Sequence, residues 1–166
     1  LSAWADQSGN DHDLTAVTAP TYNDGTSTNA INGLPVVTFD ANSEEYLKDD
    51  GNGKYLNNLD AVSVFSVVQF DGTVGSDAGY FDTEADKNKD DLLAIRYDEQ
   101  GGNDTSRDNI IKIGINNEAQ QLETSETIDG VNVQQTDPQI HQVRWASGAD
   151  LTFALNGTDD TGTPGA

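Results

Sequence analysis

Clustered acidic and amide side chains are the residues of this sequence whose types and spacing could do chemistry. Carboxylate and amide oxygens are the ligands that calcium prefers in proteins, so these clusters predict calcium as a cofactor. The candidate metal ligands are Asp49, Asp50, Asn52, Asp71 and Asp77, with Asp159 and Asp160 as a further pair. None of the clusters has the complete EF-hand register, and a solvated turn has the same composition. A calcium site and a solvated turn therefore both stay open.

Arginine and amide side chains on predicted strands form a second candidate site, for a ligand. We expect Arg96, Gln142 and Arg144 to point away from the core, because side chains alternate between the two faces of a strand and their neighbours are apolar. Guanidinium and amide groups bind sugar hydroxyls and carboxylates through paired hydrogen bonds. The alternative is that these side chains only neutralise neighbouring acids.

Catalytic patterns are weak in this sequence. Asp82, Glu84 and Asp86 would share one face of an extended segment, as glycosidase carboxylates do, but the segment runs into a hydrophilic stretch typical of a surface loop. The chain has only two histidines and no Gly-x-Ser-x-Gly turn. His141 is expected to be a strand-edge or half-buried residue. We therefore predict that the protein is not an enzyme.

The net charge narrows the classes of partner. The 166 residues include 29 Asp and Glu against 8 Lys and Arg, which gives a formal net charge of -21. Nucleic acid is not expected as a partner, because no basic patch can be assembled. Self-repulsion of this size favours surroundings where cations screen or bind the chain, such as high salt or extracellular calcium. We predict an extracellular or cell-surface protein, with a plain solubility coat as the alternative interpretation.

Three absences narrow the chemistry further. Cysteine is absent, so disulfides and thiolate chemistry cannot contribute. No apolar run reaches the length needed to span a bilayer, so membrane insertion is not expected. Methionine is absent, including at position 1, so we expect a processed product or a domain of a larger protein.

The elements that would position these residues are short strands, since apolar clusters alternate with polar turn residues. The predicted strands are residues 34–40, 63–70, 92–97, 110–115, 141–146 and 150–156. Residues 63–70 form the longest apolar run and are expected to be a central strand, and residues 116–124 to give a turn or two of helix. The last two strands form a hairpin around Ser147 and Gly148, with its apolar side chains on one face. We predict one all-β domain over residues 1–166, an antiparallel β-sandwich or jelly roll.

Three stretches carry a joint pattern along most of the chain. They are Trp4-x-Asp6-x-Ser8-Gly9-Asn10 followed by Ala30-Ile31-Asn32-Gly33-Leu34-Pro35, then Val37-x-Phe39-Asp40 running to Tyr46-Leu47, then His141-x-Val143, Gly148-x-x-Leu151 and Asn156-Gly157. In this order they resemble the laminin G-like domains of secreted and surface-attached bacterial proteins, within the concanavalin A-like lectin and glucanase superfamily. The resemblance implies a concanavalin A-like jelly roll.

The resemblance also implies roles for parts of the chain. Trp4 would pack on the sandwich, and Asp6 and Ser8 would bond the backbone of a turn. Terminal strands of the fold would be missing from this chain or supplied by another segment. The implied function is non-catalytic binding or adhesion outside the cell, with a carbohydrate or a surface protein as partner. Two alternatives stay open: a structural subunit of an extracellular filament or coat, which would bind copies of itself, and a polysaccharide-degrading glycosidase or lyase.

Overall fold

A computed structural model of the chain describes residues 1–26, 30–40, 43–49, 60–70, 79–82, 93–98, 110–115, 120–125, 127–133 and 136–160. In these ranges the protein is almost all β, its strands pair antiparallel and no α-helix is present, as the spacing of the apolar clusters predicts. Backbone contacts divide the chain into two compact units, Leu1–Tyr55 and Leu56–Ala166. That residues 1–166 form one domain stays a prediction.

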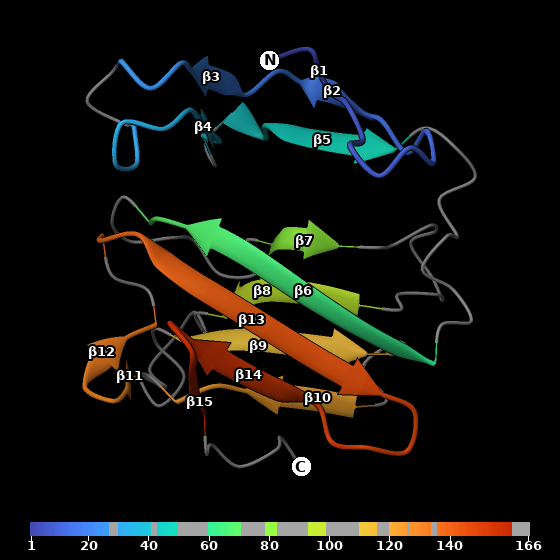
Figure 1. Cartoon of the computed structure of the whole chain (residues 1–166), viewed down its shortest axis with the longest axis vertical. Helices are drawn as coiled ribbons and strands as arrows, with labels where there is room; N and C mark the ends of the chain where they lie inside the picture. The colour runs from blue at the N-terminus through green and yellow to red at the C-terminus, as the bar shows by residue number, and fades with distance from the viewer. Residues whose placement is uncertain are drawn as a thin grey trace. The chain divides into compact units, whose positions relative to one another are not determined.

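Unit 1 (Leu1–Tyr55) consists of two small sheets (Figure 1). The first has the strand order β1 (Ala3–Trp4), β2 (Leu14–Thr18), β5 (Tyr46–Asp49), and the second pairs β3 (Thr21–Asn23) with β4 (Val36–Thr38). A tight turn precedes β4 at Asn32 and Gly33, which have positive φ angles of 52° and 73° that most side chains avoid. The strand predicted over residues 34–40 is shorter in the structure, with only three residues.

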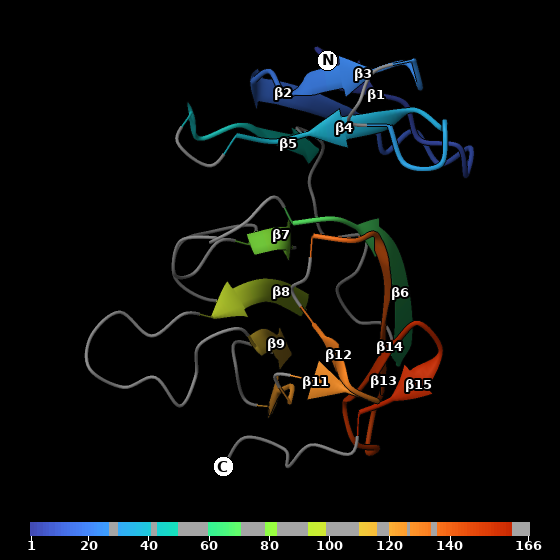
Figure 2. The same ribbon diagram turned by 90° about the vertical axis from the view of Figure 1, so that its left-hand side faces the viewer.

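Unit 2 (Leu56–Ala166) is built from two four-stranded antiparallel sheets. The first, called here the β13 sheet, has the order β15 (Thr158–Asp159), β14 (Thr152–Leu155), β13 (Gln139–Ala146), β6 (Ala61–Val68). The second, the β8 sheet, has the order β10 (Gln120–Glu123), β9 (Ile110–Ile115), β8 (Leu93–Asp98), β7 (Gly79–Asp82). A short hairpin of β11 (Thr127–Ile128) and β12 (Val131–Asn132) follows β10. Seen side on, the two sheets of unit 2 face each other as two layers (Figure 2).

Both sheets of unit 2 contribute side chains to one hydrophobic core. The buried members on the main strands are Leu93 and Ile95 of β8, Ile111 and Ile113 of β9, Leu122 of β10, Val143 and Trp145 of β13, and Phe153 and Leu155 of β14. Removing one such large side chain from water stabilises the fold by roughly 1.5–3 kcal/mol. The predicted hairpin is confirmed, because β13 and β14 pair antiparallel and present their apolar side chains to this core.

Three local predictions are wrong, each for a physical reason. The apolar run at residues 63–70 lies in β6 only up to Val68. Strand β6 is last in the strand order of its sheet among the described residues, because an apolar run does not encode how many neighbours a strand has. Residues 120–123, expected to be helical, form β10, whose pairing with β9 satisfies its backbone groups. His141 is 1% exposed rather than half-buried, because it faces inward from the central strand β13.

Candidate functional site

Five side chains mark the face of the β13 sheet that points away from the core, and we call them the outer face: Phe65, Val67, Ile140, Gln142 and Arg144. Strand register brings them together, because Phe65 pairs with Gln142 and Val67 pairs with Ile140 across β6 and β13. Phe65, Val67 and Ile140 are 66%, 63% and 49% exposed. An aromatic ring and two aliphatic side chains thus lie exposed beside an amide and a guanidinium group, an arrangement typical of a recognition surface.

Arg144 is held in place at one end of the outer face. Its guanidinium group donates to a carboxylate oxygen of Asp159 on β15 and forms an ion pair with it. This contact agrees with the alternative that the arginine neutralises an acid, and between exposed groups it contributes little to stability. The Nε–H group of Arg144 is buried, so a ligand would meet the Nη groups of the guanidinium.

Arg96, the third predicted ligand-binding residue, does not join the other two. It lies on β8, in register with Lys112 of β9 and Gly79 of β7, and therefore belongs to the β8 sheet. Gln142 and Arg144 lie on β13 in the other sheet. The structure brings together two of the three predicted residues, and places the third on a different layer of unit 2.

Sequence reasoning missed Phe65, the most exposed aromatic side chain of the outer face. In the structure, the burial of β6 alternates strictly between exposed and half-buried residues from Ala61 to Val68. That alternation is the mark of a strand with one covered face. The sequence does not show this alternation, because apolar residues stand on both faces of the strand, and the position of Phe65 opposite Gln142 follows only from the register.

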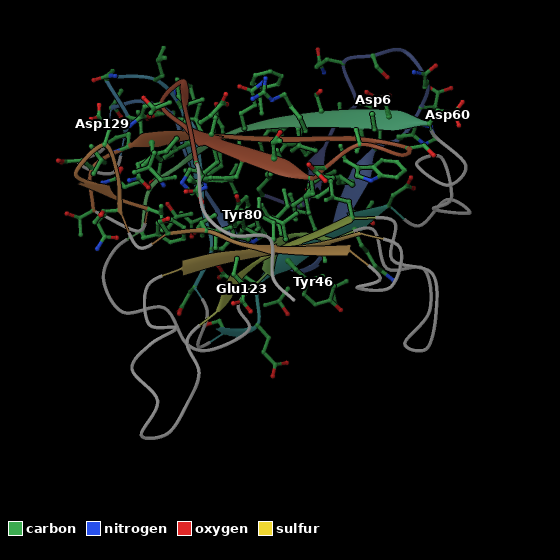
Figure 3. All side chains as sticks on the ribbon, turned by 90° about the horizontal axis from the view of Figure 1, so that it is seen from below. Asp6, Tyr46, Asp60, Tyr80, Glu123 and Asp129 are labelled. Carbon is green, nitrogen blue, oxygen red and sulfur yellow. The ribbon has the colours of Figure 1, made fainter. Side chains whose placement is uncertain are left out.

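A chain of buried polar side chains runs between the two sheets of unit 2. The hydroxyl oxygen of Tyr80 on β7 lies 3.0 Å from Nδ1 of His141 on β13, and Nε2 of that imidazole lies 3.1 Å from Oε1 of Gln139. The amide nitrogen of Gln139 donates to the carbonyl oxygen of Asn132. Figure 3 shows Tyr80 between the two layers.

The hydrogen-bond partners of these side chains, together with the lowered pKa of His141, decide which ring nitrogen carries the hydrogen. Because the Gln139 amide nitrogen donates to a carbonyl, its oxygen must be the acceptor for the histidine. Nε2 of His141 therefore carries the hydrogen, and Nδ1 accepts from the hydroxyl of Tyr80. The imidazole is neutral because burial lowers its pKa. Each polar side-chain atom of Tyr80, His141 and Gln139 has a hydrogen-bond partner.

Burial shifts the pKa values of both titratable groups in the chain. Removal from water disfavours the charged imidazolium and lowers the pKa of His141 from 6.5 to about 4, and a hydrogen bond with the Val133 backbone opposes the shift. Burial also raises the pKa of the Tyr80 hydroxyl well above its ordinary value of 10.0. The rings of Phe70, Tyr80 and Phe153 surround the imidazole, with centroids 5.2 to 6.1 Å away. His141 is a core residue here, 1% exposed among these rings.

The predicted calcium ligands are only partly within the described residues. Asp49 ends β5, and its Oδ2 lies 3.3 Å from Nδ1 of His12, in unit 1. Asp50, Asn52, Asp71 and Asp77 lie outside the described residues. Asp159 pairs with Arg144, and Asp160 accepts hydrogen bonds from the N–H and hydroxyl of Ser125. Within the described ranges no three His, Asp or Glu side chains gather closely enough to hold a metal ion.

The opening stretch of the chain forms a turn, in which Asp6 bonds the backbone as the resemblance implies. Asp6 accepts hydrogen bonds from the hydroxyl and N–H of Ser8, at 2.6 and 2.7 Å, and from the N–H groups of Asn10 and His12. These bonds, the Ser8 hydroxyl first, hold the pKa of Asp6 at about 2. Trp4, expected to pack on the sandwich, keeps 51% of its surface exposed.

The weak catalytic pattern cannot be followed into the structure. Asp82 is the last residue of β7, and Glu84 and Asp86 lie outside the described residues. No helix in the described part of the chain has the length and apolar character to cross a membrane. Comparison of the whole sequence with family models and curated proteins, and of the fold with solved structures, finds no match.

Proposed function

We propose that the protein is a non-catalytic extracellular binding module of the laminin G-like, concanavalin A-like kind, and that its outer face binds carbohydrate. The observation that carries the proposal is the pairing of exposed Phe65 with Gln142 across β6 and β13. The two facing four-stranded sheets of unit 2 agree with a sandwich architecture.

The chemistry of the outer face suits a sugar ring. The C–H groups on one side of a pyranose are apolar and stack on an aromatic ring, while its hydroxyls need planar hydrogen-bonding partners. Phe65 offers the ring, Gln142 offers an amide donor and acceptor beside it, and Arg144 offers a guanidinium group oriented by Asp159. Because these groups stand on paired strands, the site is rigid, and ordering it costs little entropy on binding.

The test is binding of the chain to a panel of neutral and anionic polysaccharides, measured by calorimetry. Phe65→Ala is expected to weaken binding roughly tenfold or more, because most of the ring's apolar contact is lost. Its thermal melt should stay close to that of the parent chain, since the side chain is 66% exposed. Gln142→Ala should weaken binding as well.

Tyr22→Ala is the matched control, because Tyr22 is an aromatic side chain of unit 1 that is also half exposed, at 53%. It is expected to leave the affinity unchanged. Equal losses in the Phe65 and Tyr22 variants would show that the outer face is not the site. Release of reducing ends or unsaturated products from any polysaccharide of the panel would show an enzyme instead.

A further inference from the structure

The free edge of β6 differs from the other sheet edges of unit 2. Among the described strands the edges are β6 and β15 in the β13 sheet, and β7 and β10 in the β8 sheet. Strands β15, β7 and β10 have two to four residues, and each contains an acidic residue, Asp159, Asp82 and Glu123. Strand β7 also has a register irregularity. Short, charged or irregular edges resist pairing with another chain.

Strand β6 has none of these protective features. It is eight residues long, Ala61–Val68, and contains no charged residue and no proline. It pairs with β13 over its whole length without a register shift, from Ala61 opposite Ala146 to Val68 opposite Gln139. Its start is anchored, because the carbonyl oxygen of Asp60 accepts from the N–H of Ser147 at 2.7 Å, and Figure 3 shows Asp60 at this end of the strand. A long, regular, uncharged edge presents a row of backbone groups that favours strand addition.

The core-facing side chains of β6 are also less buried than those of the neighbouring strand β13. Val62 and Val64 face the core from β6 and are only partly buried, whereas Val143 and Trp145 on β13 are 1% and 8% exposed. On the opposite face, Phe65 and Val67 stay more than 60% exposed. A strand added beside β6 would cover apolar side chains on both faces at once, and hydrophobic burial would add to the new backbone hydrogen bonds.

From these features we infer that β6 pairs antiparallel with β6 of a second copy of the chain, forming a dimer in which two β13 sheets become one. The added strand must match an uncharged eight-residue edge. Of the described strands only β6 and β13 have eight residues, and β13 is already paired on both sides. Two identical strands related by a twofold axis are self-complementary. Pairing centred on Phe65 places Ser63 beside Val67 of the second copy, and no charge opposes another.

The two edge strands of the β13 sheet explain why assembly stops at a dimer. Among the described strands of this sheet one edge is open, β6, and the other edge, β15, is two residues long and carries Asp159. The twofold pairing consumes the open edge of both copies and is closed. Each chain has a net charge of -21, and no charged residue lies on β6. Repulsion therefore acts between the two copies as a whole and not within the paired edge. The dimer should therefore strengthen as salt screens that repulsion.

The experiment is analytical ultracentrifugation of the full chain at about 0.1 M and about 1 M sodium chloride, where Debye lengths are about 10 and 3 Å. We expect dimers at the higher salt and weaker association at the lower. Hydrogen exchange should show β6 amides that are protected in the dimer and exchange faster on dilution to monomer. A chain that stays monomeric at both salts, or dimers without added protection in β6, overturn the proposal.

Three variants separate edge pairing from other kinds of association. Val67→Lys and Val67→Asp introduce opposite charges at a position that is 63% exposed, so both should fold. Both should weaken the dimer at least about tenfold, because either charge is desolvated at the paired edge. Association driven only by charge would be strengthened by the lysine. Ile140→Lys places a charge on the same face of the sheet but on β13, so it should leave the dimer in place. If Ile140→Lys weakens the dimer as much as the Val67 variants do, the two copies pack through their sheet faces, and β6 pairing is contradicted. The inference does not depend on carbohydrate binding, which the Gln142→Ala variant tests separately, because Gln142 lies on β13 and not on the paired edge.

Discussion

The buried imidazole of His141 makes the stability of unit 2 depend on pH. Its pKa in the folded protein is about 4, against an ordinary value of 6.5, because burial disfavours the charged form. Between these two values the unfolded chain binds a proton that the folded chain does not, so the free energy of unfolding rises with pH. The stability is complete above about pH 6.5 and is lost progressively as the pH falls toward about 4.

The size of the effect follows from the same two values. A pKa difference of roughly 2.5, at about 1.36 kcal/mol for each tenfold change in proton affinity, corresponds to about 3 kcal/mol. This is a large part of the 5–15 kcal/mol that is typical of folded proteins as a rough range. The protonated ring would also lose Nδ1 as the acceptor for Tyr80, and no acidic side chain is among its hydrogen-bond or ring contacts to compensate the charge.

The assay is urea unfolding at several values between about pH 4.5 and about pH 8. Fluorescence of Trp145, which is 8% exposed in the core, reports on unit 2, and a Trp4→Phe background removes the second tryptophan. His141→Gln in that background keeps a hydrogen-bonding side chain but cannot titrate. On acidification the free energy of unfolding of the parent should fall by about 3 kcal/mol more than that of this variant. The titration of the acidic residues is common to both proteins and cancels in the comparison. Parallel curves for the two proteins would refute this explanation.

Three further predictions concern other parts of the chain. Tyr80→Phe should lower the free energy of unfolding of unit 2 by about 1–3 kcal/mol, measured by urea unfolding, because Nδ1 of His141 loses its donor. Gly25→Ala should lower the melting temperature more than Gly9→Ala, because both glycines have positive φ but only at Gly25 would a Cβ meet backbone, the Gly33 carbonyl oxygen at 2.6 Å. The melting temperature should rise with sodium chloride, through screening, and rise again with millimolar calcium at fixed high ionic strength; identical melts with calcium and with chelator would contradict a calcium site.

The elements of unit 2 could be predicted from the sequence because their patterns are local. Residues 110–115 are predicted and observed with the same bounds, and the period-two alternation of residues 141–146 correctly separates Val143 and Trp145 from Gln142 and Arg144. Alternation depends only on the strand conformation, so it is visible without knowing the neighbours.

The relations between strands could not be predicted in the same way. Phe65 pairs with Gln142, and Tyr80 contacts His141, although the two partners of each contact are at least 61 positions apart in the sequence. Such contacts depend on sheet order and register, which an apolar run does not specify. For the same reason the sequence predicts a central position for β6, which lies at an edge, and groups Arg96 with two residues of the other sheet.

The polar chain of Tyr80, His141 and Gln139 also has a consequence for how the strands find their partners during folding. Sliding β13 by two residues along β6 and β14 would keep apolar side chains on the core side, because alternation repeats every second residue. Hydrophobic burial alone therefore distinguishes these alignments poorly. A slipped strand, however, would bring Val143 or Gln139 to the hydroxyl of Tyr80 and leave buried donors and acceptors unmatched, at about 1–3 kcal/mol for each group. The hydrogen bonds of His141 therefore favour one alignment of β13 over the slipped ones, and they specify the strand register of unit 2.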